Sequence, residues 1–302
     1  MPVTIERRGT AAVVLIENPP VNGISAEIRK GLLDAVTGLA AAGDVERVIV
    51  TGAGKIFCAG ADTREFDLAP VEPHLPDVIN AIEASSVPWI AAINGAALGG
   101  GAEIALACRF RVASAKATIG LPEVTLGVVP GATGTQRLPR LVGMAAALDI
   151  IPQGKVMKAA PALEIGFIDR IEDDPVAAAL DLDADLFANV VPLAERPGPQ
   201  ADEAAVEKAR AQASKRMKGQ TAPLEAIDLV AAAADTPFAD ALVREREAFL
   251  RLRAGGQAKA LRHIFFAERG AKAPEPIASA EAVDVRQAVV VGGGNMGASI
   301  AY

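Results

Sequence analysis

The chain has 302 residues, a formal net charge of −7 at pH 7 and a sequence pI near 5.1, so it lacks the basic surplus of a nucleic-acid-binding domain. Hydrophobic residues make up 51% of it and aromatic residues only 4%, which predicts a large and mainly aliphatic core. The acidic balance still permits an anionic ligand, because a local basic rim can hold phosphates on an acidic protein.

Short apolar runs alternate with helical patterns along the first two-thirds of the chain. Strands are predicted at residues 13–16, 47–52, 88–93 and 110–113. Helices are predicted after an N-cap at Ser25, at residues 78–84 and at residues 103–108. This alternation of strands and helices predicts an α/β fold with a parallel sheet and helical crossovers.

The composition changes after about residue 190. Residues 191–200 are rich in proline and are typical of an irregular linker, and the helical patterns beyond them, at 202–218 and 238–269, are rich in Ala, Glu, Lys and Arg. We therefore predict a first domain over residues 1–190 and a helical extension with a linker over residues 191–284. The last part, residues 285–302, is predicted to begin a further domain.

That last part contains an apolar run, residues 287–291, which leads into G-x-G-x-x-G at Gly292, Gly294 and Gly297. A strand followed by this spacing is typical of a dinucleotide-binding domain. The second strand and the acidic residue that such a domain needs about twenty positions further on would lie beyond Tyr302. We therefore expect the chain to be a fragment of a longer protein, with an incomplete cofactor motif that does not bind NAD.

Two glutamates lie in segments that are otherwise apolar. Glu103 follows the glycine triplet 99–101, and Glu123 follows Pro122. Burial would raise the pKa of both carboxyl groups, and two such groups can divide general acid and general base duties. Glycines at a helix start also leave N–H groups free to stabilise developing negative charge. Taken singly, each position is also typical of a glutamate in a first helical turn or a solvated turn.

A third segment, residues 57–62, lies just past a predicted strand, where ligands commonly bind in parallel sheets. Its Ala61 N–H is a candidate oxyanion donor, and the Gly100 N–H is another. Cys58 could be read as a nucleophile, but the two histidines, His74 and His263, lie in no recognisable nucleophile–base context. Two scattered histidines and two scattered cysteines also predict no metal site.

These segments resemble the crotonase (enoyl-CoA hydratase/isomerase) superfamily. The motifs that carry the resemblance follow the family's order and spacing across roughly residues 10–170. These motifs are residues 18–22, 57–62, 99–103, 121–127 and 130–138. The resemblance implies a spiral of ββα units and a coenzyme A thioester substrate. It also implies that Glu103 and Glu123 are the catalytic acids, and that the amides of Ala61 and Gly100 form the oxyanion hole.

The loop around Ala61 also offers candidate substrate-binding residues. Ala59, Asp62 and Arg64 lie within it or directly after it. Arg64 could contact a phosphate of coenzyme A, although a plain surface arginine accounts for it equally well.

The remainder of the chain is similar to multifunctional fatty-acid oxidation enzymes, in which a helix joins such a domain to a 3-hydroxyacyl-CoA dehydrogenase. This similarity implies hydration of trans-2-enoyl-CoA in β-oxidation, with Δ3–Δ2 isomerisation as a further activity. Glu103 would deprotonate the attacking water and Glu123 would protonate the α carbon. Hydration would need no cofactor, because coenzyme A belongs to the substrate and NAD only to a full-length parent.

Two other functions stay open at this point. One is a non-catalytic acyl-CoA-binding or assembly module, which retention of both glutamates argues against. The other is an NAD-dependent dehydrogenase, which the incomplete glycine motif argues against.

Cysteine usage and the start of the chain predict a reducing compartment. Cys58 and Cys108 are the only cysteines, which is too few for a disulfide scaffold. Residues 1–8 contain no apolar stretch typical of a secretory signal. The longest uncharged run, residues 84–102, contains Pro88 and four glycines, so it favours a buried strand and turn over a membrane span. We therefore expect a soluble cytoplasmic protein.

Overall fold

The computed structural model describes every residue except 1, 63–64, 66–67, 272–279, 282 and 302. The chain forms two units, residues 1–263 and residues 264–302, and each is described by itself. The predicted Arg64 lies outside the described residues.

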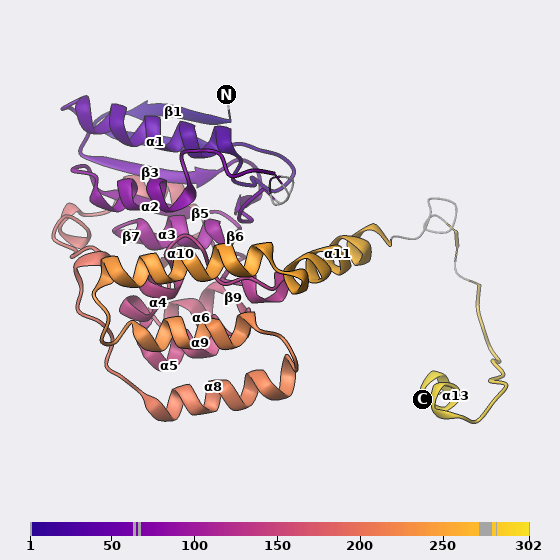
Figure 1. Ribbon diagram of the computed structural model, residues 1–302. Helices are drawn as coiled ribbons and strands as arrows, with labels where there is room; N and C mark the ends of the chain where they lie inside the picture. The colour runs from indigo at the N-terminus through magenta and orange to yellow at the C-terminus, as the bar shows by residue number, and fades with distance from the viewer. Residues whose placement is uncertain (1, 63–64, 66–67, 272–279, 282, 302) are drawn as a thin grey trace. The chain divides into compact units, whose positions relative to one another are not determined.

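Two sheets organise the larger unit (Figure 1). One has the strand order β1-β2-β3-β5-β7-β10 and the other has the order β4-β6-β8-β9. The β1–β2 and β8–β9 pairs are antiparallel and all other pairs are parallel. The strands are β1 (Val3–Arg8), β2 (Ala11–Ile16), β3 (Arg47–Gly52), β4 (Ile56–Cys58), β5 (Trp89–Ile93), β6 (Ala96–Leu98), β7 (Phe110–Ala113), β8 (Thr118–Gly120), β9 (Val156–Lys158) and β10 (Arg170–Ile171).

Successive pairs of strands feed both sheets. In β3–β4, β5–β6 and β7–β8 the first strand joins the larger sheet and the second joins the smaller one, and a helical segment follows each pair. These segments are α2 (Leu75–Ala84), α3 (Gly100–Ala107) and the 3-10 turn η2 (Glu123–Leu126), which precedes α4 (Gly134–Val142). The predicted α/β fold with a spiral of ββα units is therefore confirmed.

Further helices surround and follow this spiral. They are α1 (Ala26–Ala41), α5 (Met144–Ile150), α6 (Ala159–Glu164), α7 (Pro175–Leu180), α8 (Glu203–Arg216), α9 (Ala222–Ala232), α10 (Phe238–Ala254), α11 (Gly256–Gly270) and α13 (Asn295–Ala301), with short 3-10 turns η3 (Ala184–Leu186) and η4 (Leu193–Glu195). The α1 helix begins as predicted, with the Ser25 Oγ atom accepting a hydrogen bond from the Ile28 N–H at 3.4 Å.

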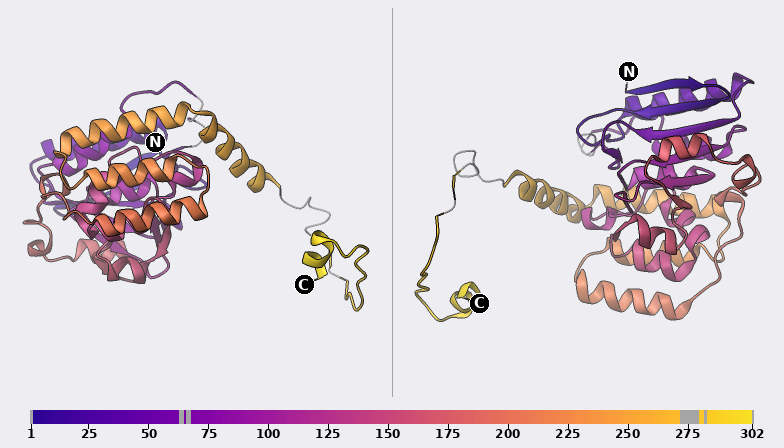
Figure 2. Two further views of the ribbon diagram at one scale, coloured as in Figure 1. Left: turned by 60° about the horizontal axis from the view of Figure 1, so that its bottom comes forward. Right: turned by 180° about the vertical axis from the view of Figure 1, so that it is seen from behind.

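The predicted helical extension packs on the spiral. Helices α8, α9 and α10 lie side by side (Figures 1 and 2), and α9 packs on α4 and α5 through a face whose Ala226, Ile227 and Val230 are fully buried. Residues 191–263 thus share one compact unit with residues 1–190. The domain boundaries inferred from composition stay a prediction.

Residues 287–291 form no strand, contrary to the sequence pattern, and Val289 and Val291 are exposed. A single strand without a neighbour leaves its backbone N–H and C=O groups unpaired, so an apolar run alone does not produce one. A short helix, α13, begins at Asn295 within the glycine motif.

Candidate active site

Glu103 lies in the first turn of α3, two residues after Gly101, the last of the glycine triplet, and is 2% exposed. Its Oε1 atom accepts hydrogen bonds from the N–H groups of Ala132 at 2.9 Å and Gly134 at 2.8 Å. Burial raises the pKa of this carboxyl group to about 7, although the two amides and the charge of Arg137 act in the opposite direction. Glu103 can therefore gain and lose a proton near neutral pH.

Glu123 begins the η2 turn and reaches the same helix start. A methyl group on Gly99, the N-cap residue of α3, would lie 3.1 Å from the Glu123 Oε1 atom. The Oε2 atom is buried and accepts no hydrogen bond from any described residue, although Glu123 as a whole is only half-buried. Burial first, and then the charge of Glu103, raise the pKa of Glu123 well above its ordinary value. The sequence-predicted pair is thus brought together.

The backbone segments of Ala61 and Gly100 lie next to each other. The Ala61 loop is held against Ile24, whose N–H donates to the Gly60 carbonyl at 2.9 Å and whose carbonyl accepts from the Asp62 N–H at 3.1 Å. Gly60 has φ +99°, and a methyl group there would lie 3.6 Å from the Gly100 nitrogen. A methyl group on Gly100 would lie 3.7 Å from the Ala61 nitrogen. The backbone nitrogens of Ala61 and Gly100 therefore lie close together at the start of α3, and their role as an oxyanion hole stays a prediction.

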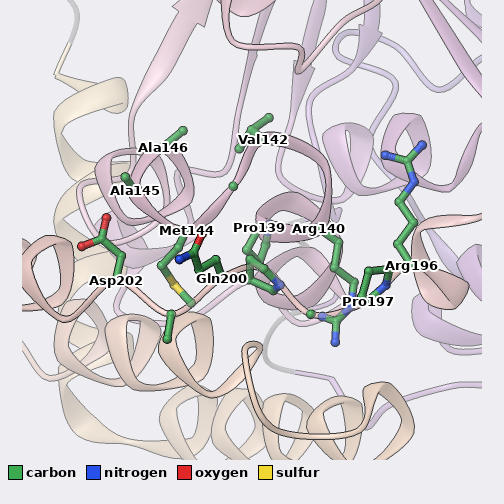
Figure 3. A pocket seen from close by; sticks show the side chains of 14 residues that line it. Pro139, Arg140, Val142, Met144, Ala145, Ala146, Arg196, Pro197, Gln200 and Asp202 are labelled. Carbon is green, nitrogen blue, oxygen red and sulfur yellow. The ribbon is translucent and has the colours of Figure 1, made fainter.

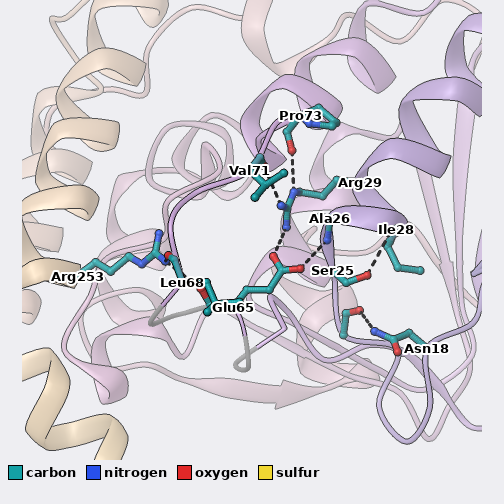
Figure 4. A network of polar contacts seen from close by, with 11 residues as sticks. Asn18, Ser25, Ala26, Ile28, Arg29, Glu65, Leu68, Val71, Pro73 and Arg253 are labelled. Carbon is teal, nitrogen blue, oxygen red and sulfur yellow. Dashed lines mark hydrogen bonds and ion pairs between the residues drawn. The ribbon is translucent and has the colours of Figure 1, made fainter.

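A buried arginine, Arg29, holds Glu65 and the backbone at residues 71 and 73 (Figure 4). Arg29 donates through Nε to the Pro73 carbonyl at 2.7 Å and through Nη2 to the Val71 carbonyl at 3.0 Å. Its Nη1 pairs with the Glu65 carboxylate at 2.7 Å, and the other oxygen of Glu65 accepts from the Ala26 N–H at 2.7 Å. Sequence reasoning missed this network, because its partners are 36 to 44 positions apart.

The helical extension also touches the segments that form the site. From α10, Arg253 donates to the carbonyls of Glu65 at 3.1 Å and Leu68 at 3.2 Å (Figure 4). At the start of α11, Ala258 lies against Gly127, which ends the turn that carries Glu123. The extension therefore contacts residues 65 and 68 as well as the turn that carries Glu123.

Replacing Gly127 by alanine should lower the free energy of unfolding more than replacing Gly166 by alanine. Both glycines have positive φ, +75° and +76°, so both changes strain the backbone. A methyl group on Gly127 would also lie 2.8 Å from the Ala258 Cα atom, whereas Gly166 faces open space. Urea unfolding should show a further loss of about 1–3 kcal/mol for Gly127→Ala. Equal losses would mean that the turn and α11 are not tightly packed.

A third buried glutamate was not predicted. Glu245 lies in α10, is 2% exposed, and accepts hydrogen bonds from the N–H groups of Thr133 at 2.5 Å and Thr135 at 2.9 Å, as well as from the Thr135 hydroxyl. Burial first, and then the charge of Glu103, raise its pKa to about 8. The sequence does contain a signal, which is a glutamate on the apolar face of a helix. The other buried residues on that face are Ala241, Ala248 and Leu252.

The other predicted substrate-binding residues near Ala61 are in place, but their roles stay predictions. Ala59 donates its N–H to the Val21 carbonyl at 3.1 Å, and Asp62 is buried in the loop held by Ile24.

The cysteines do not form a reactive site. Burial raises the pKa of the Cys58 and Cys108 thiols to about 12, so both stay protonated at neutral pH. Among the described residues, no three His, Cys, Asp or Glu side chains gather in a way that could hold a metal ion.

The better-formed of two cavities lies away from these residues. It measures about 750 Å³ and is lined by the junction of α4 and α5 and by residues 196–202, including Arg140 and Arg196 (Figure 3). Neither Glu103 nor Glu123 lines it. A smaller cavity of about 260 Å³ lies between α2 and α10 and is lined by Thr133 and Glu245 among others. The convergence of carboxyl groups and amides, and not cavity size, therefore identifies the candidate site.

The glycine motif lies in the smaller unit. Gly292 has φ +110°, and a methyl group on Gly297 would lie 1.8 Å from the Gly292 carbonyl oxygen, so the loop needs glycine for its own turn. Gly294 is exposed beside them. Within residues 283–301 these glycines are not backed by a sheet, which a dinucleotide pocket requires.

The chain is similar to known proteins along most of its length. The sequence model described as enoyl-CoA hydratase/isomerase matches residues 6–225. A peroxisomal bifunctional enzyme of Danio rerio is 38% identical over 304 residues, covering 96% of this chain and 42% of the relative. A fatty acid oxidation complex subunit alpha of Psychrobacter sp. is 35% identical, covering 95% of this chain and 43% of the relative. The chain thus spans less than half the length of these curated relatives.

Solved structures show the same fold. The structure of a carnitinyl-CoA dehydratase from Mycobacterium avium 104 matches with a TM-score of 0.65 and 30% identity, and it covers 87% of this chain and 96% of that protein.

The prediction of a cytoplasmic location is wrong by this comparison, because the Danio rerio relative is named as a peroxisomal protein. Two free cysteines and the composition of residues 1–8 do not distinguish one reducing compartment from another. A peroxisomal address is a short signal read by a receptor, so it leaves the composition unchanged. Within the described parts of the chain, no helix combines the length and the apolar character needed to cross a bilayer.

Proposed function

We propose, since this chain belongs to the enoyl-CoA hydratase/isomerase family, that it adds water to a trans-2-enoyl-CoA thioester and forms a 3-hydroxyacyl-CoA. The observation that carries this proposal is the pair of carboxyl groups, Glu103 and Glu123, at the start of α3 beside the amides of Ala61 and Gly100. The Psychrobacter relative, whose name refers to fatty acid oxidation, supports β-oxidation as the setting.

The two amides would polarise the substrate. Addition to the β carbon moves negative charge onto the thioester oxygen, and N–H groups fixed in advance stabilise that charge without reorganisation. In the proposed geometry the thioester oxygen lies between Ala61 and Gly100. Loss of one such donor typically costs about 2.7–4 kcal/mol of transition-state stabilisation.

The two glutamates would move the protons. Glu103 removes a proton from water as the water oxygen bonds to the β carbon, and Glu123 gives a proton to the α carbon. A proton exchanged between the carboxyl groups, or with solvent, then restores the starting state, so that only water is consumed. Burial raises the pKa of both carboxyl groups above the ordinary value, so each is better suited to exchange a proton than an exposed glutamate is.

Isomerisation between Δ3- and Δ2-enoyl-CoA is the second candidate activity. It requires one carboxyl group to remove a proton from one carbon and return it to another. The buried Glu123 Oε2 atom, which accepts no hydrogen bond from a described residue, favours this role.

The proposed reaction involves an acyl-CoA substrate and needs no further cofactor. Coenzyme A is part of the substrate, and water is the other reactant. NAD binding at Gly292, Gly294 and Gly297 is proposed only for an intact parent with a 3-hydroxyacyl-CoA dehydrogenase domain. The curated relatives, of which this chain spans 42%, are long enough to include one.

Hydration should show a bell-shaped dependence on pH. Glu103 must be ionised to act as the base, so the rate should fall as pH decreases through its pKa of about 7. Glu123 must be protonated to act as the acid, so the rate should fall again as pH rises through the pKa of Glu123, which burial and the charge of Glu103 raise above its ordinary value. The measurement is conversion of crotonyl-CoA to its 3-hydroxy product by the 302-residue chain, across pH. Binding of the thioester without conversion at any pH would favour a binding module instead.

A further inference from the structure

Two glutamates from distant parts of the chain hold one short segment. The backbone N–H groups of residues 132 and 134 donate to Glu103, and those of residues 133 and 135 donate to Glu245. The donors alternate strictly between the two carboxyl groups. The segment is therefore clamped between α3 on one side and α10 on the other, immediately before α4.

The two glutamates hold the 132–135 backbone in an uncommon conformation. Thr133 has φ +90°, an uncommon conformation for a β-branched residue, and it is 2% exposed. Gly134 is closely confined, since a methyl group there would lie 2.9 Å from the Glu103 Oε1 atom. A shift of the 132–135 segment toward α10 would thus pull its amides away from Glu103.

The charges that surround Glu245 come from several elements. Glu103 on α3 and Glu123 on η2 interact with it electrostatically. On α10, the neighbouring Arg246 interacts with Glu245 and with Asp77 of α2. From α4, Arg137 acts on Glu103. Burial, the charge of Glu103 and the charge of Glu245 all raise the pKa of Glu123, and Glu245 has the weakest effect of the three.

We propose that Glu245 is a positioning residue for the reaction, which holds the 132–135 segment so that its amides keep the Glu103 carboxylate oriented toward water. This role rests on the proposed hydration. It also makes the helical extension part of the active site, since the carboxyl group that completes the clamp comes from α10.

The test is Glu245→Gln in the full 302-residue chain, with Glu247→Gln as the matched control. Glutamine has one acceptor oxygen for the three donors that Glu245 binds, and its amide group would face an N–H group. Glu247 is an exposed residue on the same helix, so the control makes the same charge change. We expect Glu245→Gln to lower kcat by roughly 10²-fold, the scale of a 1 Å misplacement, and to leave KM nearly unchanged. Glu247→Gln should keep the kcat and KM of the wild type.

The pH profile separates positioning from a merely structural role. Glu245 is ionised above its pKa of about 8, and its charge there raises the pKa of Glu123. Glu245→Gln removes that charge and should move the alkaline limb of the profile to lower pH. A folded Glu245→Gln protein with wild-type kcat and unshifted limbs would overturn the role of Glu245. A wild-type chain that does not hydrate crotonyl-CoA would instead overturn the proposed function.

A second pair of variants covers the case in which Glu245→Gln does not fold. Thr135→Val removes the hydroxyl donor to Glu245 and keeps the side-chain shape, while Thr135→Ser keeps the donor. We expect a lower kcat for Thr135→Val and near wild-type kcat for Thr135→Ser. Equal activity of the folded Thr135→Val protein and the wild type would also overturn the proposal.

Discussion

Replacing either Glu103 or Glu123 by glutamine should lower kcat for hydration by about 10²–10⁴-fold, the usual contribution of a general acid or base. Glutamine has nearly the same shape, and its carbonyl oxygen can still accept the amides of Ala132 and Gly134 in place of the Glu103 Oε1 atom. The change therefore removes proton transfer and largely preserves the geometry. Steady-state turnover of crotonyl-CoA is the measurement, with KM for the thioester expected to stay close to that of the wild type.

An isomerase assay divides the two roles further. If Glu123 alone moves the proton in Δ3–Δ2 isomerisation, Glu103→Gln should keep much of that activity while Glu123→Gln loses it. Glu164→Gln, an exposed glutamate on α6, is the control for loss of one negative charge. Full hydration by both active-site variants would exclude the two-carboxylate mechanism.

Replacing Arg137 by methionine should lower the free energy of unfolding by about 3–5 kcal/mol, the usual cost of breaking a buried ion pair from one side. Arg137 on α4 pairs with Glu83 on α2 at 2.5 Å, and the two side chains are 1% and 5% exposed. The other oxygen of Glu83 accepts from the Ala194 N–H at 3.2 Å. Removal of the guanidinium leaves this carboxylate buried without its counter-charge, and urea unfolding should report the loss.

Two further variants test whether the loss in Arg137→Met comes from leaving a buried charge unpaired. Arg210→Met breaks an exposed pair with Asp228 and should cost at most about 1 kcal/mol. The double variant Glu83→Gln/Arg137→Met should recover part of the loss, because it removes the uncompensated charge. A loss for Arg137→Met no larger than that for Arg210→Met would mean that burial of the pair is not what makes it important.

Strong local patterns made much of the fold predictable. The strands at residues 47–52 and 110–113 occur with the predicted bounds, because short apolar runs of this kind have few alternatives inside an α/β protein. The second sheet was missed, since its strands β4, β6 and β8 have three residues each and show no period. The helix predicted over residues 238–269 breaks at Gly255, whose ψ of 153° is extended.

The site was only partly predictable for a related reason. Glu103 and Glu123 were found because each lies in a segment with its own glycine or proline pattern. Glu245 was missed because its partners lie 110 and 112 positions away, and sequence distance carries no information about which helix covers which loop. An acidic residue on the apolar face of α10 was the one local sign, and in isolation it indicates burial but not a partner.

The contact between α10 and the 132–135 segment sets a lower limit on how far this protein can be shortened. A version that ended at residue 190, or at residue 225 where the family match ends, would lack α10. The amides of Thr133 and Thr135 would lose their acceptor, and Gly131, over which the Phe249 ring lies, would lose its cover. The family motifs are complete by residue 138, but the smallest version with an intact site must extend beyond Ala254.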